Sequence, residues 1–199
     1  MKSISKFKNV SESDIWNSEN IYHLKTDTTR ISTLINHYEL YKKIISLPGD
    51  VVECGVFKGI SLTRFLTFRE ILENNYSRKI YGFDVSRHGV KNSKPEVKKN
   101  LFIHNANKKF PFKSKYFDLV ISLACLHNLK AYDLEKSIKE IQRVGKRAYI
   151  MVEGYRNEQE LFNLQCWALT AETFFDDKEW KWLFKKCKYN GDFEYIYFQ

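Results

Sequence analysis

Residues 49–61 read GDVVECGVFKGIS, and this stretch predicts a buried strand, a carboxylate at its end, a glycine turn and the start of a helix. Val51 and Val52 are the β-branched residues that a covered parallel strand prefers. Gly55 allows a sharp turn after the strand, and Gly59 allows the helix to lie close to the strand or to a ligand. Together these features are typical of a ligand site at the carboxyl end of a strand in an open α/β sheet.

The spacing of the glycines distinguishes between classes of ligand. A dinucleotide site needs G-x-G-x-x-G and a P-loop needs a final Gly-Lys-Ser/Thr, and the stretch has neither. Its pattern, E-x-G-x-x-x-G-x-S, resembles motif I of the class I S-adenosylmethionine-dependent methyltransferases. The resemblance implies that the carboxylate faces the ammonium of the methionine part of the cofactor, and that the cofactor contacts Glu53, Gly55, Phe57, Gly59 and Ser61. A strand-turn-helix without a ligand is the alternative.

A second strand, residues 79–84, ends in Asp84. In nucleotide-binding βαβ units, an acidic residue about 20 or more residues after the glycine loop holds a ribose, because a carboxylate accepts hydrogen bonds from vicinal hydroxyls. The alternative is that Asp84 only caps the next turn. The register with Glu53 favours the ribose role, and Val85 is expected beside it.

Two further strands follow. Residues 101–104 are short and apolar, and the resemblance implies an amide against the adenine amino group just after them. Asn105 is the better candidate for that amide, with Asn107 as the alternative and Ala106 beside it. The run FPF…YFDLVIS…LHNL resembles the fourth strand of the same family and its loop, which adds Ser122 and Leu123 to the expected cofactor contacts.

The alternation of strands and helices predicts an α/β fold, a doubly wound, mostly parallel, Rossmann-like sheet of five or six strands. Residues 11–47 are expected to be helical, with an apolar face over the cofactor pocket or the sheet formed by Ile31, Leu34, Ile35, Tyr38, Tyr41, Ile44 and Ile45. Helices are also expected from residue 64 to 75, 132 to 143, 159 to 173 and 178 to 187, and strands at 147–152 and 193–198. The predicted organisation is a helical cap, 1–47, on a cofactor-binding unit, 48–199, within one domain. Because one strand is visible after Cys187, the usual terminal hairpin of the family is expected to be shortened.

Composition limits the class of protein. The chain has 199 residues, of which 43% are hydrophobic, so one globular domain with a core is expected. No apolar run approaches the ~20 residues of a membrane span, and residues 1–9 lack the apolar core of a secretory signal, so a cytoplasmic protein without a membrane partner is predicted. The four cysteines form no C-x-x-C pair, which argues against zinc and disulfides.

The net charge of +9 has two interpretations. Lysines cluster between residues 91 and 115 and again between 181 and 188, and such clusters are one signature of nucleic-acid binding. A solvated lysine-rich surface is favoured, because acidic residues interleave the second group and no nucleic-acid motif accompanies either. Nucleic acid is therefore not the expected partner, and a homodimer stays open.

The run LPGDVVECGVFKG is similar to macrocin O-methyltransferase-like sugar methyltransferases, which use a metal held by paired aspartates after the fourth strand. This chain has no such pair there, so no metal is predicted. His127 follows the fourth strand and is predicted to be the catalytic base or an orienting group; packing in the loop is the alternative. The expected acceptor contacts, each of which fits a core position as well, are Tyr38, Glu153, Tyr155, Arg156 and Trp167.

The sequence thus predicts an enzyme that uses S-adenosylmethionine, with S-adenosylhomocysteine as product, to methylate an oxygen of a small molecule or saccharide without a metal. The alternatives are a methyltransferase acting on RNA or protein, which the lysine clusters would serve, and a protein that binds the cofactor without catalysis. A nicotinamide oxidoreductase is a distant fourth, because G-x-G-x-x-G is missing.

Overall fold

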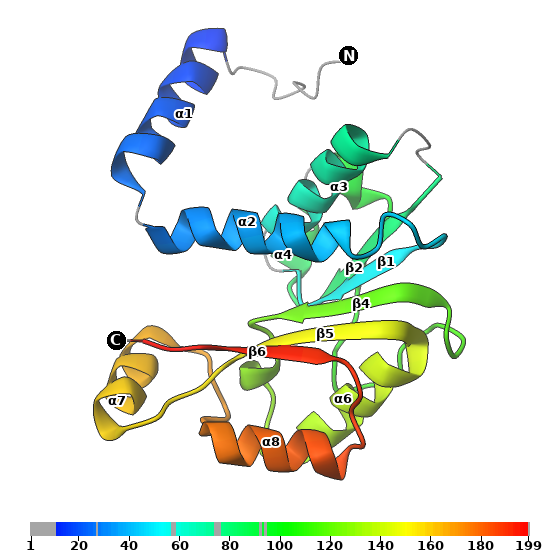
Figure 1. The fold of residues 1–199 in the computed structure, drawn as a ribbon, viewed down its shortest axis with the longest axis vertical. Coiled ribbons are helices and arrows are strands. Elements are labelled where there is room, and N and C mark those ends of the chain that lie inside the picture. The colour runs from blue at the N-terminus through cyan, green and yellow to red at the C-terminus, as the bar shows by residue number, and fades with distance from the viewer. Residues whose placement is uncertain are drawn as a thin grey trace.

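The computed structural model describes residues 11–26, 28–56, 59–73, 77–91, 93 and 95–198. Within them helices and strands alternate along the chain (Figure 1), in the order α1 Glu12–Lys25, α2 Thr28–Lys42, β1 Val51–Cys54, α3 Ile60–Leu72, β2 Ile80–Asp84, α4 Arg87–Lys91, α5 Pro95–Lys98, β3 Leu101–Ile103, β4 Phe117–Leu123, a 3₁₀ turn η1 Leu126–Asn128, α6 Ala131–Val144, β5 Gly145–Glu153, α7 Glu158–Trp167, α8 Asp177–Lys186 and β6 Asp192–Ile196.

The strands form one sheet. The described residues contribute six strands in the order β3-β2-β1-β4-β5-β6, and every neighbouring pair is parallel. This confirms the predicted Rossmann-like, doubly wound fold. The sequence predicted a mostly parallel sheet, and the described strands are wholly parallel. The last strand, β6, pairs directly with β5 in the parallel sense, with Tyr149 opposite Asp192, where the family normally has an antiparallel hairpin.

The strand order reverses between β1 and β4. From β1 the chain proceeds outward through β2 and β3, and it then returns to place β4 on the other side of β1. Connections on the two sides therefore leave in opposite directions, and in open α/β sheets the carboxyl ends of the strands at such a point typically border a ligand-binding crevice. The predicted glycine turn after β1 lies at this point.

The core has two layers, one on each face of the sheet. Val51, Leu119 and Ile121 face a layer built with α2 and α3, whereas Val52 and Val120 face a layer built with α6 and α8. Figure 1 shows the same arrangement, with α2 and α3 on one side of the sheet and α6 and α8 on the other. Because both faces are covered, β1 and β4 are buried along almost their whole lengths.

The N-terminal segment forms two helices rather than one continuous helix. Thr26 adopts an extended conformation that ends α1, and α2 then runs at a wide angle to it (Figure 1). Of the predicted apolar face, Tyr41 and Ile44 are fully buried, but Ile35 and Ile45 are exposed, which corrects the prediction for these two residues. The apolar stripe is therefore narrower than predicted, because only the part of α2 that faces α3 and the sheet is covered.

Arg78 fixes the segment between α2 and β1. Its guanidinium is 4% exposed and donates to the carbonyl oxygens of Ile44, Leu47 and Gly49 at 2.7–2.9 Å, and its Nε donates to Glu73 at 2.8 Å. The predicted boundary between cap and cofactor-binding unit, at residues 47 and 48, lies inside this clamped segment.

The helix predicted at residues 159–173 is shorter in the structure, because α7 ends at Trp167. The backbone N–H groups of Glu172 and Thr173 donate to the carbonyl oxygen of His127, and the Thr170 hydroxyl donates to Asn128. These tertiary hydrogen bonds draw the chain away from a helical path. The other predicted elements agree with the structure to within a few residues at each end.

Among the described residues, the structure contains no helix that combines the length and apolarity required to cross a bilayer.

Candidate functional site

The glycine turn after β1 lies against the end of β2. The backbone N–H groups of Gly55 and Val56 donate to the carbonyl oxygen of Phe83 at 2.9 and 3.3 Å. Gly55 has φ +83° and Gly59 has φ +76°, values that side-chain-bearing residues rarely adopt. Gly59 also precedes the first turn of α3, so the turn leads directly into that helix.

Glu53 is a buried carboxylate at the end of β1. Its side chain is 2% exposed, Oε1 accepts a hydrogen bond from the Ser61 hydroxyl of α3, and Oε2 is buried with no hydrogen-bond partner among the described residues. Burial raises the pKa of Glu53 to about 8; the Asp84 carboxylate acts in the same direction, and the Ser61 hydrogen bond opposes both. A buried carboxyl with a vacant oxygen is suited to a cationic ligand.

Asp84 ends the neighbouring strand β2. Its Oδ1 accepts a hydrogen bond from the backbone N–H of Ser86 at 2.8 Å, so the alternative reading of Asp84 as a turn cap is present in the structure. Ribose binding stays a prediction for this residue. In the same way, Asn105 Oδ1 caps its own turn by accepting from the N–H of Asn107 at 3.0 Å. Asn107 Nδ2 donates to Asp133 at 3.0 Å, and Asn107 Oδ1 is buried with no hydrogen-bond partner among the described residues. Adenine binding by Asn105, with Asn107 as the alternative, stays a prediction.

Cys125, which the sequence analysis left without a role, packs on the glycine turn. A Cβ atom built on Gly55 would lie 2.2 Å from Cys125 Sγ. Burial, together with the nearby carboxylates of Asp84, Glu53 and Glu153, raises the pKa of the Cys125 thiol to about 12. The thiol is therefore neutral near pH 7 and unsuited to nucleophilic chemistry. The signal in the sequence was its place two residues after β4, the strand beside β1.

His127 and Glu153 form a buried pair. The His127 Nδ1 atom and the Glu153 Oε2 atom are hydrogen-bonded, and the two side chains are 7% and 1% exposed. His127 lies in η1 after β4, and Glu153 is the last residue of β5. The indole N–H of Trp180 in α8 donates to the Glu153 carbonyl oxygen at 2.9 Å, which fixes that end of β5. A carboxylate on one nitrogen of an imidazole leaves the other nitrogen for chemistry.

Aromatic side chains surround this pair. Trp167 at the end of α7 meets the His127 ring edge-on at a centroid distance of 6.1 Å, and it packs against Phe198 at 4.7 Å. Trp167 is 53% exposed, so one side of its ring is available to a ligand. The loop after α7 is held on η1 by the hydrogen bonds to His127 and Asn128 described above, which places Trp167 next to the histidine.

Other predicted acceptor contacts are engaged elsewhere. Arg156 pairs with Glu160, one turn further in α7, and its guanidinium lies 4.1 Å over the Tyr197 ring. Tyr38 packs edge-on against Phe68 of α3 at 5.5 Å, as part of the core. Tyr155 is partly buried near the start of α8, where burial and then Glu179 and Asp176 raise its pKa.

The remaining predicted cofactor contacts fall at the same edge of the sheet, at the ends of β2, β3 and β4. Val85 is 61% exposed, Ala106 and Ser122 are buried, and Leu123 is partly buried. The Ser122 hydroxyl has no hydrogen-bond partner among the described residues. Phe57 lies outside the described residues. Cofactor binding by these residues stays a prediction.

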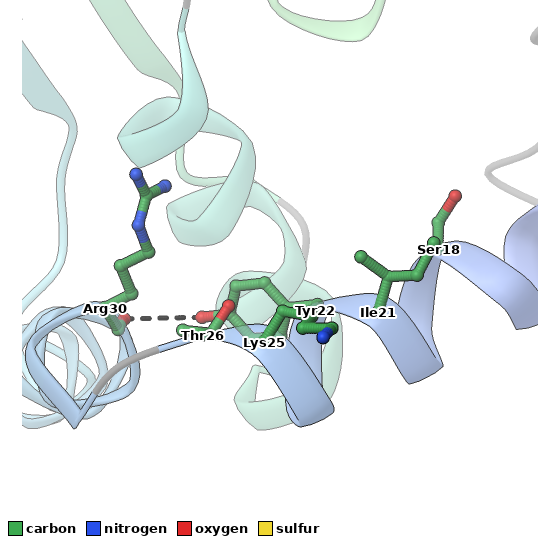
Figure 2. A pocket seen from close by; sticks show the side chains of 6 residues that line it. All are labelled: Ser18, Ile21, Tyr22, Lys25, Thr26 and Arg30. Carbon is green, nitrogen blue, oxygen red and sulfur yellow. Dashed lines mark hydrogen bonds between the residues drawn. The ribbon is translucent and has the colours of Figure 1, made fainter.

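A separate hollow lies at the elbow between the first two helices. It measures about 550 Å³ and is lined by Ser18, Ile21, Tyr22, Lys25, Thr26 and Arg30. Figure 2 shows these side chains, with the Tyr22 hydroxyl donating to the Arg30 carbonyl oxygen at 3.3 Å. Its lining comes from α1, α2 and the residue that ends α1, and it includes none of the predicted site residues. The chemistry at the strand ends therefore marks the candidate site better than this hollow does.

Comparison with known proteins adds an independent finding. Residues 66–151, from the middle of α3 to within β5, match the family model described as a methyltransferase domain. The matched segment comprises 86 of the 199 residues. This match confirms the predicted enzyme class, a methyltransferase with S-adenosylmethionine as its cofactor. The matched segment begins at residue 66, after the glycine turn, so the match does not include that turn.

Several solved structures are similar to this chain in fold. A SAM-dependent methyltransferase from Archaeoglobus fulgidus is similar with a TM-score of 0.60 and 15% identity, over 86% of this chain and 73% of that one. A chain from the complex that contains the Haloferax volcanii Trm112 methyltransferase activator gives 0.55 and 19%, over 89% and 76%. A SAM-dependent methyltransferase from Aquifex aeolicus gives 0.50 and 18%, over 75% and 78%. None of the curated proteins matches the sequence significantly.

The residues at the strand ends fit this cofactor. The vacant Oε2 of Glu53 suits an ammonium group, and the two left-handed glycines bring backbone, without side chains, to the crevice. S-adenosylmethionine carries a sulfonium and an amino acid but no phosphate. The absence of a phosphate-binding pattern from residues 49–61 therefore agrees with this ligand.

Proposed function

We propose that this methyltransferase transfers the methyl group of S-adenosylmethionine to an oxygen of a small molecule or saccharide, with His127 as general base. The observation that carries the proposal is the buried pair of His127 and Glu153 at the ends of β4 and β5. A hydroxyl acceptor must lose its proton to attack, and histidine is suited to accept it near neutral pH. The proposal assigns this step to the imidazole, without a metal.

Glu153 acts in this proposal as a positioning residue rather than as the acceptor contact predicted from the sequence. Its carboxylate accepts the Nδ1–H of His127, which sets the tautomer and leaves the Nε2 lone pair for the acceptor proton. The same carboxylate stabilises the imidazolium that forms. The hydrogen bonds from Glu172 and Thr173 to the His127 carbonyl oxygen hold the backbone still.

The cofactor is assigned to Glu53, the glycine turn, Asp84 and Asn105. When bound there, S-adenosylmethionine supplies an electrophilic methyl group on its sulfonium. In this proposal Glu53 binds the ammonium, and the Asp84 carboxylate binds the ribose hydroxyls. Trp167, which meets the His127 ring edge-on, helps in this proposal to exclude water from the imidazole.

An uncharged acceptor fits the site best. Carboxylates dominate the strand ends, and Arg156, the one cation among the predicted acceptor contacts, pairs with Glu160 and lies over the Tyr197 ring. Trp167 and Phe198 offer an apolar wall on which a sugar or an aromatic ring can stack. Phenols and neutral sugars are therefore the first acceptors to test.

The test is formation of S-adenosylhomocysteine from S-adenosylmethionine with a panel of phenols and neutral sugars. With any accepted compound, His127→Ala is expected to lower turnover by about 10²–10⁴-fold, the usual contribution of a general base, while cofactor affinity stays the same. His23→Ala on the exposed helix α1 is the matched control. Full turnover in the His127→Ala variant would contradict the assignment of His127 as the general base.

The alternative acceptor is RNA, for which the lysine clusters are the supporting observation. Binding to RNA with an affinity that falls steeply with salt, together with methylation of RNA, would favour it over the small-molecule proposal. Cofactor binding without turnover on any acceptor would instead indicate a non-catalytic role.

A further inference from the structure

The carboxyl of Glu53 has surroundings that favour its neutral form. It is 2% exposed, and one oxygen has no hydrogen-bond partner among the described residues. The groups that face it are the Ser61 hydroxyl from α3, the Asp84 carboxylate from β2, and the Cys54 and Cys125 thiols from β1 and from the loop after β4. Among these groups there is no cation. Lys58, in the turn, lies outside the described residues.

A charge in such surroundings needs a partner. A buried carboxylate without a cation costs several kcal/mol, and proteins avoid that cost by keeping the group protonated. The raised pKa of Glu53, caused chiefly by burial, agrees with this geometry. A ligand that brings an ammonium to Oε2 reverses the preference, because the ion pair then favours the carboxylate.

We propose that Glu53 is protonated in the cofactor-free protein and releases its proton to solvent when the cationic methionine part of the cofactor docks. The inference rests on the cofactor site of the proposed function. The O–H bond of the Glu53 carboxyl breaks, its electron pair stays on the carboxylate, and a water or buffer molecule takes the proton. Cofactor binding is thereby linked to pH through one residue.

The link between cofactor binding and proton release from Glu53 predicts two measurable results. Near pH 7, binding of S-adenosylhomocysteine is expected to release about one proton per molecule bound. Between pH 6 and pH 7, affinity is expected to rise by up to about tenfold, since one proton must leave. Over this range the amino group of the ligand stays mostly protonated, as an α-amino group titrates near pH 8.

The experiment is calorimetric titration of the full chain with S-adenosylhomocysteine at pH 7 in phosphate and in Tris. These buffers differ in ionisation enthalpy, so the difference in heat counts the protons. Glu53→Gln mimics the neutral carboxyl and is expected to fold, to release almost no proton, and to bind with an affinity that is flat between pH 6 and pH 7. Asp84→Asn, which alters the neighbouring carboxyl, is expected to bind more weakly and still release a proton.

Each outcome decides between the proposals. Binding by the wild type with no proton release, or equal release from Glu53→Gln, overturns the inference and leaves the cofactor site standing. Loss of release in Lys58→Gln, with Glu53 intact, also overturns it. No binding of S-adenosylhomocysteine by the wild type overturns the proposed cofactor site itself. If Glu53→Gln does not fold, the pH dependence of wild-type affinity remains the test, and a flat profile counts against the inference.

Discussion

Gly55, in the turn after β1, lies against Cys125, in the loop after β4. Its left-handed backbone turns the chain out of β1, and its missing side chain makes room for Cys125. Gly55→Ala is therefore expected to destabilise the fold by about 2–5 kcal/mol, from backbone strain and overpacking together. Urea denaturation gives the free energy of unfolding.

Removal of the Cys125 side chain separates the two causes. In the Cys125→Gly background, Gly55→Ala is expected to cost about 1–3 kcal/mol less, because the Cys125 Sγ and Cβ atoms, 2.2 and 2.6 Å from the added Cβ, are both absent and the strain remains. A double-mutant cycle with no coupling between the two positions would show that Cys125 does not occupy the space beside Gly55.

At the scale of elements, Arg78 connects α2, α3 and β1. It bonds three carbonyl oxygens between Ile44 and Gly49, and it pairs with Glu73, which also accepts from the Tyr41 hydroxyl at 2.7 Å. Arg78→Met is expected to cost about 3–5 kcal/mol, because it removes the cation that pairs with the partly buried Glu73 and the donor to these three carbonyl oxygens. The exposed neighbour serves as the control, and Lys79→Met is expected to change stability by less than about 0.5 kcal/mol in the same denaturation experiment. Equal effects of the two variants would contradict the clamp.

The sequence predicted the order and type of most elements because their signals are local. Val51 and Val52, the carboxylates of Glu53 and Asp84, and the glycine turn all lie where one strand meets one helix. The end of α7 at Trp167 was missed, because no glycine or proline marks it and the hydrogen bonds that end the helix come from η1, about 40 residues earlier. The roles of Glu153, Cys125 and Arg78 were missed for the same reason: each depends on a contact between distant parts of the chain.

At the scale of the whole molecule, α1 stands apart from the packed body (Figure 1). It has no buried side chain, and Trp16, Ile21 and Leu24 are exposed. Removal of residues 1–25 is therefore expected to change the free energy of unfolding by less than about 0.5 kcal/mol. Ile44→Ala, at a buried position of the segment that follows α2, is the contrasting variant, with an expected loss of about 2–5 kcal/mol. A large loss on truncation would mean that α1 packs on the body in solution.

The stability of the molecule is also expected to fall in acid through His37. Burial, together with the nearby Arg64 guanidinium, lowers the pKa of His37 from 6.5 to about 4. The unfolded chain therefore binds a proton below pH 6.5 that the folded chain refuses until about pH 4, so stability falls as pH drops across this range. Relative to His37→Gln, the wild type is expected to lose about 1.4 kcal/mol per pH unit there, measured by denaturation at pH 6.5, 5.5 and 4.5. Parallel profiles would contradict a buried, neutral His37.

The projecting helix gives the chain an optical probe of its own. Four tryptophans are present, and Trp16 on α1 is 67% exposed whereas Trp180 is fully buried in the body. A helix of 14 residues is about 21 Å long, so any swing at the elbow moves Trp16 through a wide arc. Polarised emission from Trp16 then decays in nanoseconds, faster than the tumbling of the body that carries Trp180. The difference in fluorescence anisotropy decay between the wild type and Trp16→Phe therefore reports the motion of α1 relative to the rest of the molecule, without any added label.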